Sequence, residues 1–289
     1  MISVPATGPF FHRAAGQDAD GERFCFFHAP GTTPMRGSVL AVHAFAEEMN
    51  KTRAAVADGA RALAAAGFAV LQIDLTGCGD SAGDFEEATW VRWMADLTEA
   101  WAWLADRTGD AGAQRWLWGT RLGALLAEQF ASQCEPRADG LLLWQPVVSG
   151  AQHLNQFLRL KTVGSLLRNT GGPPEVTAVI GAAPSPRADL AAGVSVEIAG
   201  YRLNPSLADA IENAQLGMRE AAPSRVRWFE VSSQPSASLS PVASRVTDRW
   251  RAAGSDVAAS TIVGTAFWQT QEIERCDALV AASVAALST

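Results

Sequence analysis

The sequence predicts an α/β fold with a mostly parallel central sheet, helices on both faces of the sheet and a cap insertion. Apolar segments bounded by Gly and Pro alternate with helical segments along the first half of the chain. Near-continuous apolar runs are typical of strands covered on both faces, and the alternation is typical of right-handed crossovers in a parallel sheet. The alternation stops at residue 149 and resumes at residue 225. We therefore expect a single domain over residues 1–289, with a cap at roughly 149–221.

The first predicted elements are two strands, a helix and a third strand. The segments 23–30 (RFCFFHAP) and 37–45 (GSVLAVHAF) are apolar and bounded by Gly or Pro, as strands are. In the helical segment that follows, Asn50 is a suitable N-cap and Gly67 a suitable C-terminal stop. The apolar segment 68–74 (FAVLQID) predicts the next buried strand.

The middle of the chain predicts a second helix and a tight strand–turn–helix unit. Apolar residues at offsets 0, 3, 4, 7, 11 and 14 from Trp90 lie on one face of a helix over about 86–106. The segment 116–118 (WLW) predicts a buried strand, followed by a Gly-bounded turn and a helix that opens at Leu122. Residues 140–148 (GLLLWQPVV) predict another strand.

The expected cap has a different pattern from the rest of the chain. It contains helical pieces at 151–168 and 204–217 around Gly- and Pro-rich stretches. The segments after it predict a strand, a helix, a strand and a final helix, at 225–231, 241–253, 258–264 and about 271–287.

Composition limits the function. A net charge of −7 and a pI near 5.2 argue against nucleic-acid binding, which needs clustered cations. The four cysteines are scattered without a C-x-x-C motif, so we expect reduced thiols and no metal site. The first residues lack the pattern of a signal peptide, and no apolar run reaches the roughly 20 residues of a membrane span. We expect a cytoplasmic protein without a cofactor, and its arginine- and alanine-rich composition indicates a bacterial source.

Three motifs together resemble the α/β-hydrolase fold over most of the chain. Residues 43–50 (HAFAEEMN) match the loop that carries a backbone donor for the oxyanion. Residues 74–83 (DLTGCGDSAG) match the loop after the next strand, and 119–123 (GTRLG) match the G-x-S-x-G nucleophile elbow. Arg121 stands where the elbow serine is expected.

The other two positions of the serine–histidine–acid triad are also replaced in the sequence. The fold places the acid and then the histidine after the nucleophile in the chain. No carboxylate occurs from Ser232 through Thr247, and Phe267 or Trp268 fills the expected histidine position. The histidines of the chain are His12, His28, His43 and His153, all before the expected acid strand. The sequence therefore indicates a non-catalytic or atypical member.

Two interpretations of Arg121 remain open. A guanidinium stays protonated, so it is neither a nucleophile nor a base. At a helix N-terminus it can anchor a carboxylate, phosphate or acyl ligand. Alternatively, it forms an internal ion pair with Asp74, Asp80, Glu47 or Glu48. The candidate ligand-binding residues are Arg121, His43, Ala44, Phe45, Leu122, Cys78 and Trp268.

Catalysis by other residues is a second hypothesis. Cys78 and His43 lie on neighbouring loops and could form a thiolate dyad for ester or thioester hydrolysis or acyl transfer. Ser81 is a weaker candidate nucleophile. The structural interpretation is that Cys78 packs and Ser81 hydrogen-bonds within its loop. His153 is expected to be exposed, as lone histidines on polar helices usually are, and Trp118 and Trp268 to fill the core or line the pocket.

The amino-acid sequences of the motifs resemble those of one subgroup, the exosortase A system-associated hydrolases of type 2. The resemblance lies in 74–85 (DLTGCGDSAGDF), 118–127 (WGTRLGALLA) and 267–269 (FWQ). It implies an α/β-hydrolase fold and gene neighbourhoods that produce exopolysaccharide. It also implies exopolysaccharide-pathway proteins and acyl carrier proteins as partners, and an acyl or thioester ligand.

Overall fold

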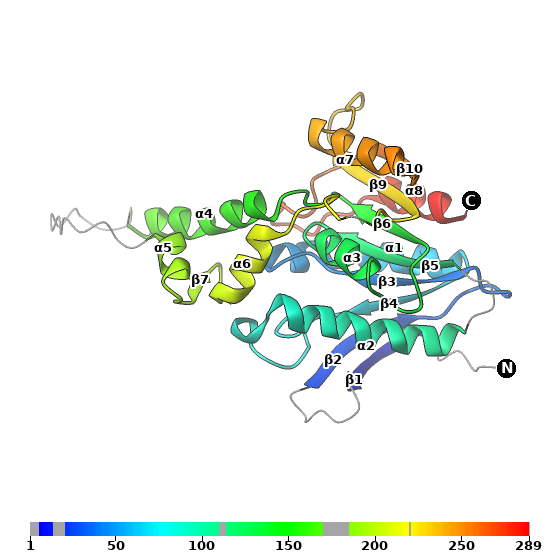
Figure 1. The fold of residues 1–289 in the computed structure, drawn as a ribbon, viewed down its shortest axis with the longest axis horizontal. Helices are drawn as coiled ribbons and strands as arrows, with labels where there is room; N and C mark the ends of the chain where they lie inside the picture. The colour runs from blue at the N-terminus through cyan, green and yellow to red at the C-terminus, as the bar shows by residue number, and fades with distance from the viewer. Residues whose placement is uncertain (1–5, 14–20, 110–113, 170–184, 220, 289) are drawn as a thin grey trace.

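The structure is a computed structural model that describes residues 6–13, 21–109, 114–169, 185–219 and 221–288, with the backbone alone at 161–169. It is built around an eight-stranded sheet in the order β1-β2-β4-β3-β5-β6-β9-β10 (Figure 1). β1 and β2 are antiparallel to their neighbours, and the remaining strands are parallel. The predicted mostly parallel sheet is confirmed. Its strands are β1 (Gly8–Arg13), β2 (Glu22–His28), β3 (Gly37–Val42), β4 (Phe68–Ile73), β5 (Gln114–Thr120), β6 (Gly140–Trp144), β9 (Arg225–Ser232) and β10 (Asp256–Val263).

Helices cover both faces of this sheet, as predicted. Helices α1 (Glu47–Ala65) and α8 (Asp277–Ser288) pack together on one face. Helices α2 (Trp90–Thr108), α3 (Gly123–Ala131) and α7 (Pro241–Ala252) contribute to the core of the other face. Because side chains alternate along a strand, β3 supplies Leu40 and Val42 to one core and Val39 and Ala41 to the other. The inner strands β3, β4 and β6 are consequently apolar at most positions.

The chain leaves the sheet between β6 and β9. Figure 1 shows this excursion extending away from the sheet. Its elements are α4 (Gly150–Asn169), α5 (Pro186–Ala191), the hairpin β7 (Val196–Ile198) and β8 (Tyr201–Leu203), and α6 (Pro205–Asn213). Asn204 caps α6 and donates its amide to the carbonyl oxygens of Glu86 and Ala88, beside the 3-10 turn η2 (Phe85–Glu87). The excursion is therefore anchored to the segment that leads into α2.

Several boundaries differ from the sequence prediction. Strand β1 was not predicted. It is an edge strand whose six residues (GPFFHR) are all partly buried or exposed, so it lacks the apolar run of a buried strand. Helix α1 begins at Glu47 rather than after Asn50, because the loop after β3 turns sharply at Ala46 (φ +50°). Asn50 instead donates a hydrogen bond to the Tyr201 hydroxyl in the excursion. The acidic residues of this first turn suit the positive end of the helix dipole.

Three more elements start or stop away from their predicted positions. Helix α2 begins at Trp90, where Thr89 accepts a hydrogen bond from the Arg92 N–H as its N-cap. Strand β6 ends at Trp144 because Gln145 adopts a positive φ of 42°. Helix α8 begins at Asp277, later than predicted.

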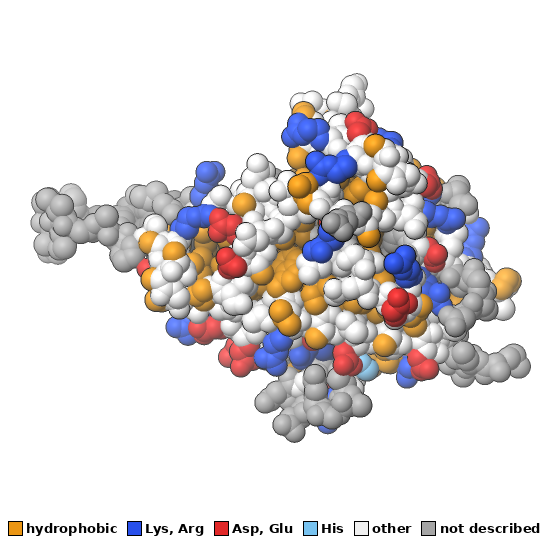
Figure 2. All heavy atoms as spheres, viewed as in Figure 1, with side chains coloured by type: hydrophobic (Ala, Val, Ile, Leu, Met, Phe, Trp, Pro, Cys, Tyr) orange, Lys and Arg blue, Asp and Glu red, His pale blue; other side chains and the backbone are white. Residues whose placement is uncertain are grey.

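The described part of the molecule has surface properties that agree with the composition. Basic and acidic side chains are interspersed on the face drawn in Figure 2, so the residues described there form no continuous basic surface. Among the described helices, none is long and apolar enough to cross a membrane.

Candidate functional site

The turn after β5 has the sharp geometry of a nucleophile elbow. Arg121 has a φ of +54°, a conformation that non-glycine residues rarely adopt. A Cβ atom at Gly119 would lie 2.5 Å from the Ala124 Cα atom, and one at Gly123 would lie 2.4 Å from the Val42 carbonyl oxygen. The two glycines thus allow β5, α3 and β3 to approach closely.

The elbow lies where the strand order reverses. The connection from β3 through α1 leads to β4 on one side, whereas the next connection leads to β5 on the other side. In open α/β sheets, ligands bind at the carboxyl ends of strands beside such a switch point. Arg121 is therefore at the place where the fold usually holds a ligand or substrate.

An internal carboxylate binds the guanidinium of Arg121. Its Nε atom lies 3.2 Å from both Glu48 oxygens, and Nη2 lies 2.9 Å from Glu48 Oε1. Nη1 donates to the Gln145 carbonyl oxygen at 3.2 Å, and the guanidinium carbon lies 5.1 Å from the centre of the Trp268 ring. The Arg121 and Glu48 side chains are only 11% and 12% exposed. Of the four carboxylates considered from the sequence, Glu48 is the partner.

His153 is buried beside this ion pair, so the expectation that it is exposed was wrong. It is 7% exposed, and its Nε2 atom lies 4.0 Å from Glu48 Oε2. Burial lowers the pKa of His153 to about 4, an effect that Glu48 opposes and Arg121 reinforces. Neither ring nitrogen has a hydrogen-bond partner within the described residues. A neutral imidazole with a free donor and a free acceptor therefore faces the elbow.

A helical pattern in the sequence could have revealed this burial. His153 and Phe157 are four residues apart on α4, so they share one face of the helix. Both are buried, and both rings contact the ring of Phe45 from the loop after β3. Between them, Leu154 is also buried, whereas residues 155–156 are exposed.

Two hollows lie on either side of the Arg121–Glu48–His153 cluster. The aromatic hollow, of about 230 Å³, has walls that include Phe45, Phe157 and Trp268. Its polar lining comprises Glu47, Glu48, Lys51, His153, Gln156 and Gln269. The polar hollow, of about 310 Å³, is lined by Arg121, Gln145, Ser149, Gln152, His153 and Glu230, among others. Arg121 and Glu48 thus form part of the boundary between the two spaces.

Three residues that line the aromatic hollow carry polar atoms that are buried and have no partner within the described residues. Glu47 Oε2, both nitrogens of His153 and Trp268 Nε1 have no hydrogen bond within the described residues. Burial raises the pKa of Glu47, and the neighbouring Glu48 raises it further. Because buried polar groups are nearly always hydrogen-bonded, this hollow has the character of a site for a ligand or water.

Comparisons with known proteins identify the family. Residues 33–188 match the family described as serine aminopeptidase, S33. The chain belongs to the S33 family. No curated protein matches it.

Solved structures show the same fold as this S33 family member. One is Est1E from Butyrivibrio proteoclasticus with bound ferulic acid (14% identity, 94% of this chain and 95% of that chain covered, TM-score 0.60). Another is a soluble variant of monoglyceride lipase from Saccharomyces cerevisiae with a substrate analogue (12% identity, 100% and 96% covered, TM-score 0.61). At these identities the likeness concerns the fold alone. The predicted α/β-hydrolase fold is confirmed.

The contacts of His43 in this S33 family member use both ring nitrogens. Nδ1 donates to the Ala44 carbonyl oxygen at 2.6 Å, and Nε2 accepts from the Leu75 N–H at 3.2 Å. Burial lowers the pKa of His43. The imidazole is therefore a neutral link between the loops after β3 and β4, and neither nitrogen is available to take a proton from Cys78.

Cys78 and Ser81 are held in the structural roles that the sequence also suggested. Cys78 is buried, and burial raises the pKa of its thiol, with Asp74 adding to the effect. An activated thiolate requires the opposite shift. The Ser81 hydroxyl donates to the Asp74 carbonyl oxygen and accepts from the Phe24 N–H. These contacts weigh against catalysis by either residue in this conformation.

The remaining candidates divide between the core and the hollow. Ala44 and Leu122 are buried, and Phe45 lines the aromatic hollow. Trp268 lies under Arg121 and lines the same hollow. Trp118, by contrast, packs edge-to-face on Trp144 in the core. The structure thus brings together Arg121, Phe45 and Trp268, and adds Glu48, Glu47 and His153, which the candidate list did not include.

Proposed function

We propose that this S33 family member is non-catalytic or atypical and binds an acyl group in the aromatic hollow beside the elbow. The unpartnered buried polar atoms of His153, Trp268 and Glu47 among aromatic walls carry this proposal. The cap at about 149–221 is part of the proposed site, because α4 contributes His153 and Phe157 to the hollow.

The elbow supports a role other than nucleophilic catalysis. A guanidinium remains protonated at all physiological pH values, so Arg121 cannot attack a carbonyl carbon. Trp268, from the segment where the fold usually carries its histidine, stacks under Arg121 rather than supplying a base. Arg121 and Glu48 neutralise each other, and we propose that this pair shapes the wall of the site rather than anchoring a charged ligand directly.

The lining of the hollow favours a neutral acyl derivative over an anion. Phe45, Phe157 and Trp268 provide apolar surface for the chain of an acyl group. Trp268 Nε1 can donate to an ester or thioester carbonyl, and His153 can donate or accept once. Glu47 and Glu48 outnumber Lys51 in the lining, so a carboxylate or phosphate gains little there. An anionic ligand remains the other outcome of the test.

The motifs that resemble the exosortase A-associated subgroup are the basis for proposing where in the cell, and with which partner, this binding takes place. We propose a bacterial exopolysaccharide-type system, a cytoplasmic location and an acyl carrier protein as the donor of the acyl group. The resemblance of 74–85 and 118–127 to that subgroup is the basis for this part of the proposal. Titration of labelled protein with an octanoylated acyl carrier protein and with its unacylated form tests it, and equal responses to both would contradict it.

The main test measures binding and turnover on one protein. S-octanoyl-N-acetylcysteamine and p-nitrophenyl octanoate are titrated by calorimetry, and product release is followed in parallel. We expect saturable binding without turnover, and binding weakened about fivefold or more by Trp268→Phe, which removes one donor. Trp118→Phe is the matched control, because Trp118 also has a buried, unpartnered Nε1 but packs in the core.

Two results would contradict the proposal. One is steady turnover by the wild-type chain; if Cys78→Ala abolished it, the hydrolase or acyltransferase hypothesis would be supported instead. The other is equal binding by the Trp268→Phe and Trp118→Phe variants, which would exclude the aromatic hollow as the site.

A further inference from the structure

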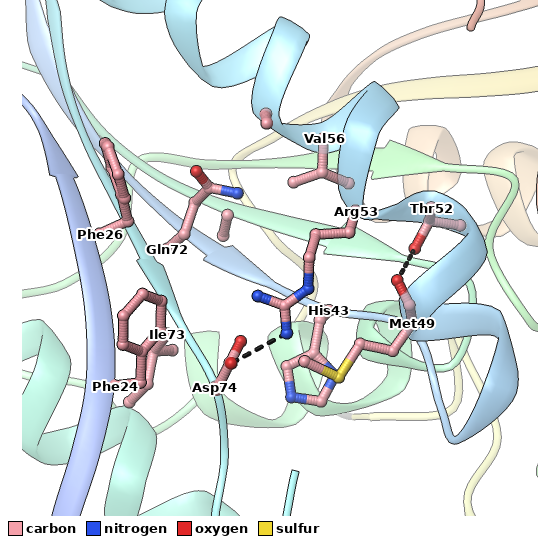
Figure 3. A pocket seen from close by; sticks show the side chains of 12 residues that line it. Phe24, Phe26, His43, Met49, Thr52, Arg53, Val56, Gln72, Ile73 and Asp74 are labelled. Atoms are coloured by element: carbon pink, nitrogen blue, oxygen red, sulfur yellow. Dashed lines mark hydrogen bonds and ion pairs between the residues drawn. The ribbon is translucent and has the colours of Figure 1, made fainter. Parts of the chain in front are cut away.

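A separate hollow of about 230 Å³ lies on the α1 face of the sheet. Helix α1 forms one wall, and strands β2, β3 and β4 form the other (Figure 3). We call it the Arg53 hollow, after the charged residue that reaches across it. Its lining shares no residue with the aromatic hollow or the polar hollow at the elbow.

Most of the Arg53 hollow is apolar. Phe24 and Phe26 from β2 face Val56 from α1 across the space, with Ile73 from β4 beside Phe24 (Figure 3). Phe24 and Phe26 are only partly buried, so their rings offer apolar surface to a bound molecule. A flat or short apolar body fits between such walls.

Arg53 brings unused hydrogen-bond donors to this apolar space. Its Nη2 atom donates to Asp74 Oδ2 at 2.9 Å. Its Nε and Nη1 groups have no partner within the described residues, and the side chain is 41% exposed. Figure 3 shows the guanidinium extending from α1 toward β4, with one nitrogen bonded to Asp74 and another on the side of Phe24 and Phe26.

The other polar groups of the hollow are mostly either engaged or further donors. Thr52 donates its hydroxyl to the Met49 carbonyl oxygen, and both nitrogens of His43 are bonded. Gln72 Oε1 accepts a hydrogen bond from His28 Nε2 at 2.8 Å, so the amide N–H groups of Gln72 are free to donate to a molecule in the hollow. Asp74 Oδ2 already accepts from Arg53 and from the Asp80 N–H. Asp74 Oδ1 accepts no hydrogen bond within the described residues, so one carboxylate oxygen remains beside the more numerous unused donors of Arg53 and Gln72.

We propose that the Arg53 hollow binds a small monocarboxylate with an aromatic or short apolar body. The carboxylate accepts from the Nη1 group of Arg53 in a charge-assisted hydrogen bond, because Nε lies on the opposite edge of the guanidinium and Nη2 is bonded to Asp74. The apolar body lies between the phenylalanine side of the hollow and α1. Asp74 neutralises part of the charge of Arg53 and so weakens its attraction for an anion, but Arg53 keeps an Nη1 donor, unused within the described residues, for a single carboxylate. The proposal does not depend on the function proposed for the elbow.

The first experiment compares two molecules of the same shape. The full chain is titrated with 3-phenylpropionate and with the uncharged 3-phenylpropan-1-ol by calorimetry. We expect the carboxylate to bind about tenfold more tightly, because only it forms charge-assisted hydrogen bonds with Arg53. Equal affinity for both molecules would overturn the assignment of the carboxylate to Arg53.

Variants then locate the binding. Arg53→Met is expected to remove the preference for the carboxylate, and Arg92→Met, at an exposed position on α2, to retain it. Because Arg53→Met leaves Asp74 without its ion-pair partner, Ala57→Leu provides a second variant. It narrows the hollow without changing a charge, and we expect it to weaken binding of both molecules. Unchanged binding by folded Ala57→Leu protein would overturn the proposal.

A further variant tests whether the elbow, rather than Arg53, binds the carboxylate. In Glu48→Gln/Arg121→Met protein both charges of the elbow pair are removed, and we expect binding of 3-phenylpropionate to be unchanged. Loss of binding in this double variant, with retention in Arg53→Met, would assign the carboxylate to the elbow and contradict the Arg53 site. An acyl ligand that fails to bind the aromatic hollow would not affect this result.

Discussion

At the residue scale, Arg121 sets the chemistry of the elbow through its neighbours as much as through its own charge. Its guanidinium is paired with Glu48, bonded to the Gln145 carbonyl oxygen and stacked near Trp268. A substrate carbonyl at this position would meet an occupied donor instead of a nucleophile. The side chain therefore acts as part of the protein interior.

We predict that Arg121→Ser does not create an esterase. The new hydroxyl would lack an effective base. His43 is bonded through both nitrogens, and His153, whose nitrogens beside the elbow have no partner within the described residues, is a weak base because burial lowers its pKa to about 4. The variant should also lose about 3 kcal/mol of stability, because Glu48 would remain buried without its partner. Urea unfolding and the rate of p-nitrophenyl butyrate hydrolysis measure these two effects.

The double variant Glu48→Gln/Arg121→Met is the control for the stability change. It removes both charges, so we expect it to be more stable than Arg121→Ser. A stoichiometric burst of nitrophenol from Arg121→Ser protein would show that a base is present and would contradict the proposed non-catalytic elbow.

His153 should make the stability of the protein depend on pH. Its pKa is about 4 in the folded chain and near 6.5 in the unfolded chain, so the unfolded chain binds the proton more readily. Its contribution is complete above about pH 6.5 and is lost as the pH falls toward 4, by up to about 3 kcal/mol. We expect His153→Gln to flatten this part of the stability profile, measured by urea unfolding between pH 4 and pH 8. An unchanged slope would mean that the imidazole is not buried in solution.

At the element scale, helix α3 carries a buried acid that links it to the end of the excursion. Glu128 Oε1 accepts from the Gly217 N–H at 2.8 Å. Burial raises the pKa of Glu128 to about 7, against the lowering effects of this hydrogen bond and of Arg219. The neutral acid is thus favoured in the folded chain.

We predict that Glu128→Gln stabilises the protein at pH 8. The folded pKa is above the unfolded value, so the contribution of Glu128 is complete below about pH 4.5 and falls as the pH rises to about 7, by up to about 3 kcal/mol. The glutamine keeps the acceptor for Gly217 without the charge. The pH profile of urea unfolding measures the gain, and lower stability of the variant at pH 8 would contradict it.

The sequence predicted the elements better than their ends. The strands were predicted from apolar runs, because a strand buried on both faces is apolar at successive positions. The buried face of α2 was predicted from apolar residues at helical spacing. The start of α1 was missed because it depends on the turn at Ala46, and Asn50 resembles a cap although it contacts Tyr201. Such choices depend on contacts between distant segments.

At the scale of the whole molecule, the excursion between β6 and β9 supplies side chains that line the aromatic hollow. It also supplies hydrogen bonds that attach the excursion to the rest of the fold. Helix α4 supplies His153 and Phe157, and Asn204 ties the start of α6 to the segment before α2. The geometry of the aromatic hollow therefore depends on how firmly this excursion is attached.

We predict that Asn204→Ala destabilises the protein by about 2 kcal/mol. The change removes the N-cap of α6 and two hydrogen bonds to the carbonyl oxygens of Glu86 and Ala88. Octanoyl binding should weaken as well, if the aromatic hollow is the site. Asn213→Ala is the matched control, because within the described residues the Asn213 amide donates only to Asp209 of the same helix. A difference below about 0.5 kcal/mol between the variants in urea unfolding would show that the anchor is unimportant.

The sequence by itself determined the α/β-hydrolase fold and the arginine at the elbow, because apolar periodicity and residue identity are local properties. Only the tertiary structure selected Glu48 among four possible partners of Arg121, 73 residues away in the chain. It also buried His153 and left its nitrogens unpartnered. The spacing of His153 and Phe157 indicates a shared helix face. The residues that this face meets, Phe45 and Glu48 in and after the loop that follows β3, are set only by the tertiary structure. The candidate site therefore became defined only when the segments were folded together.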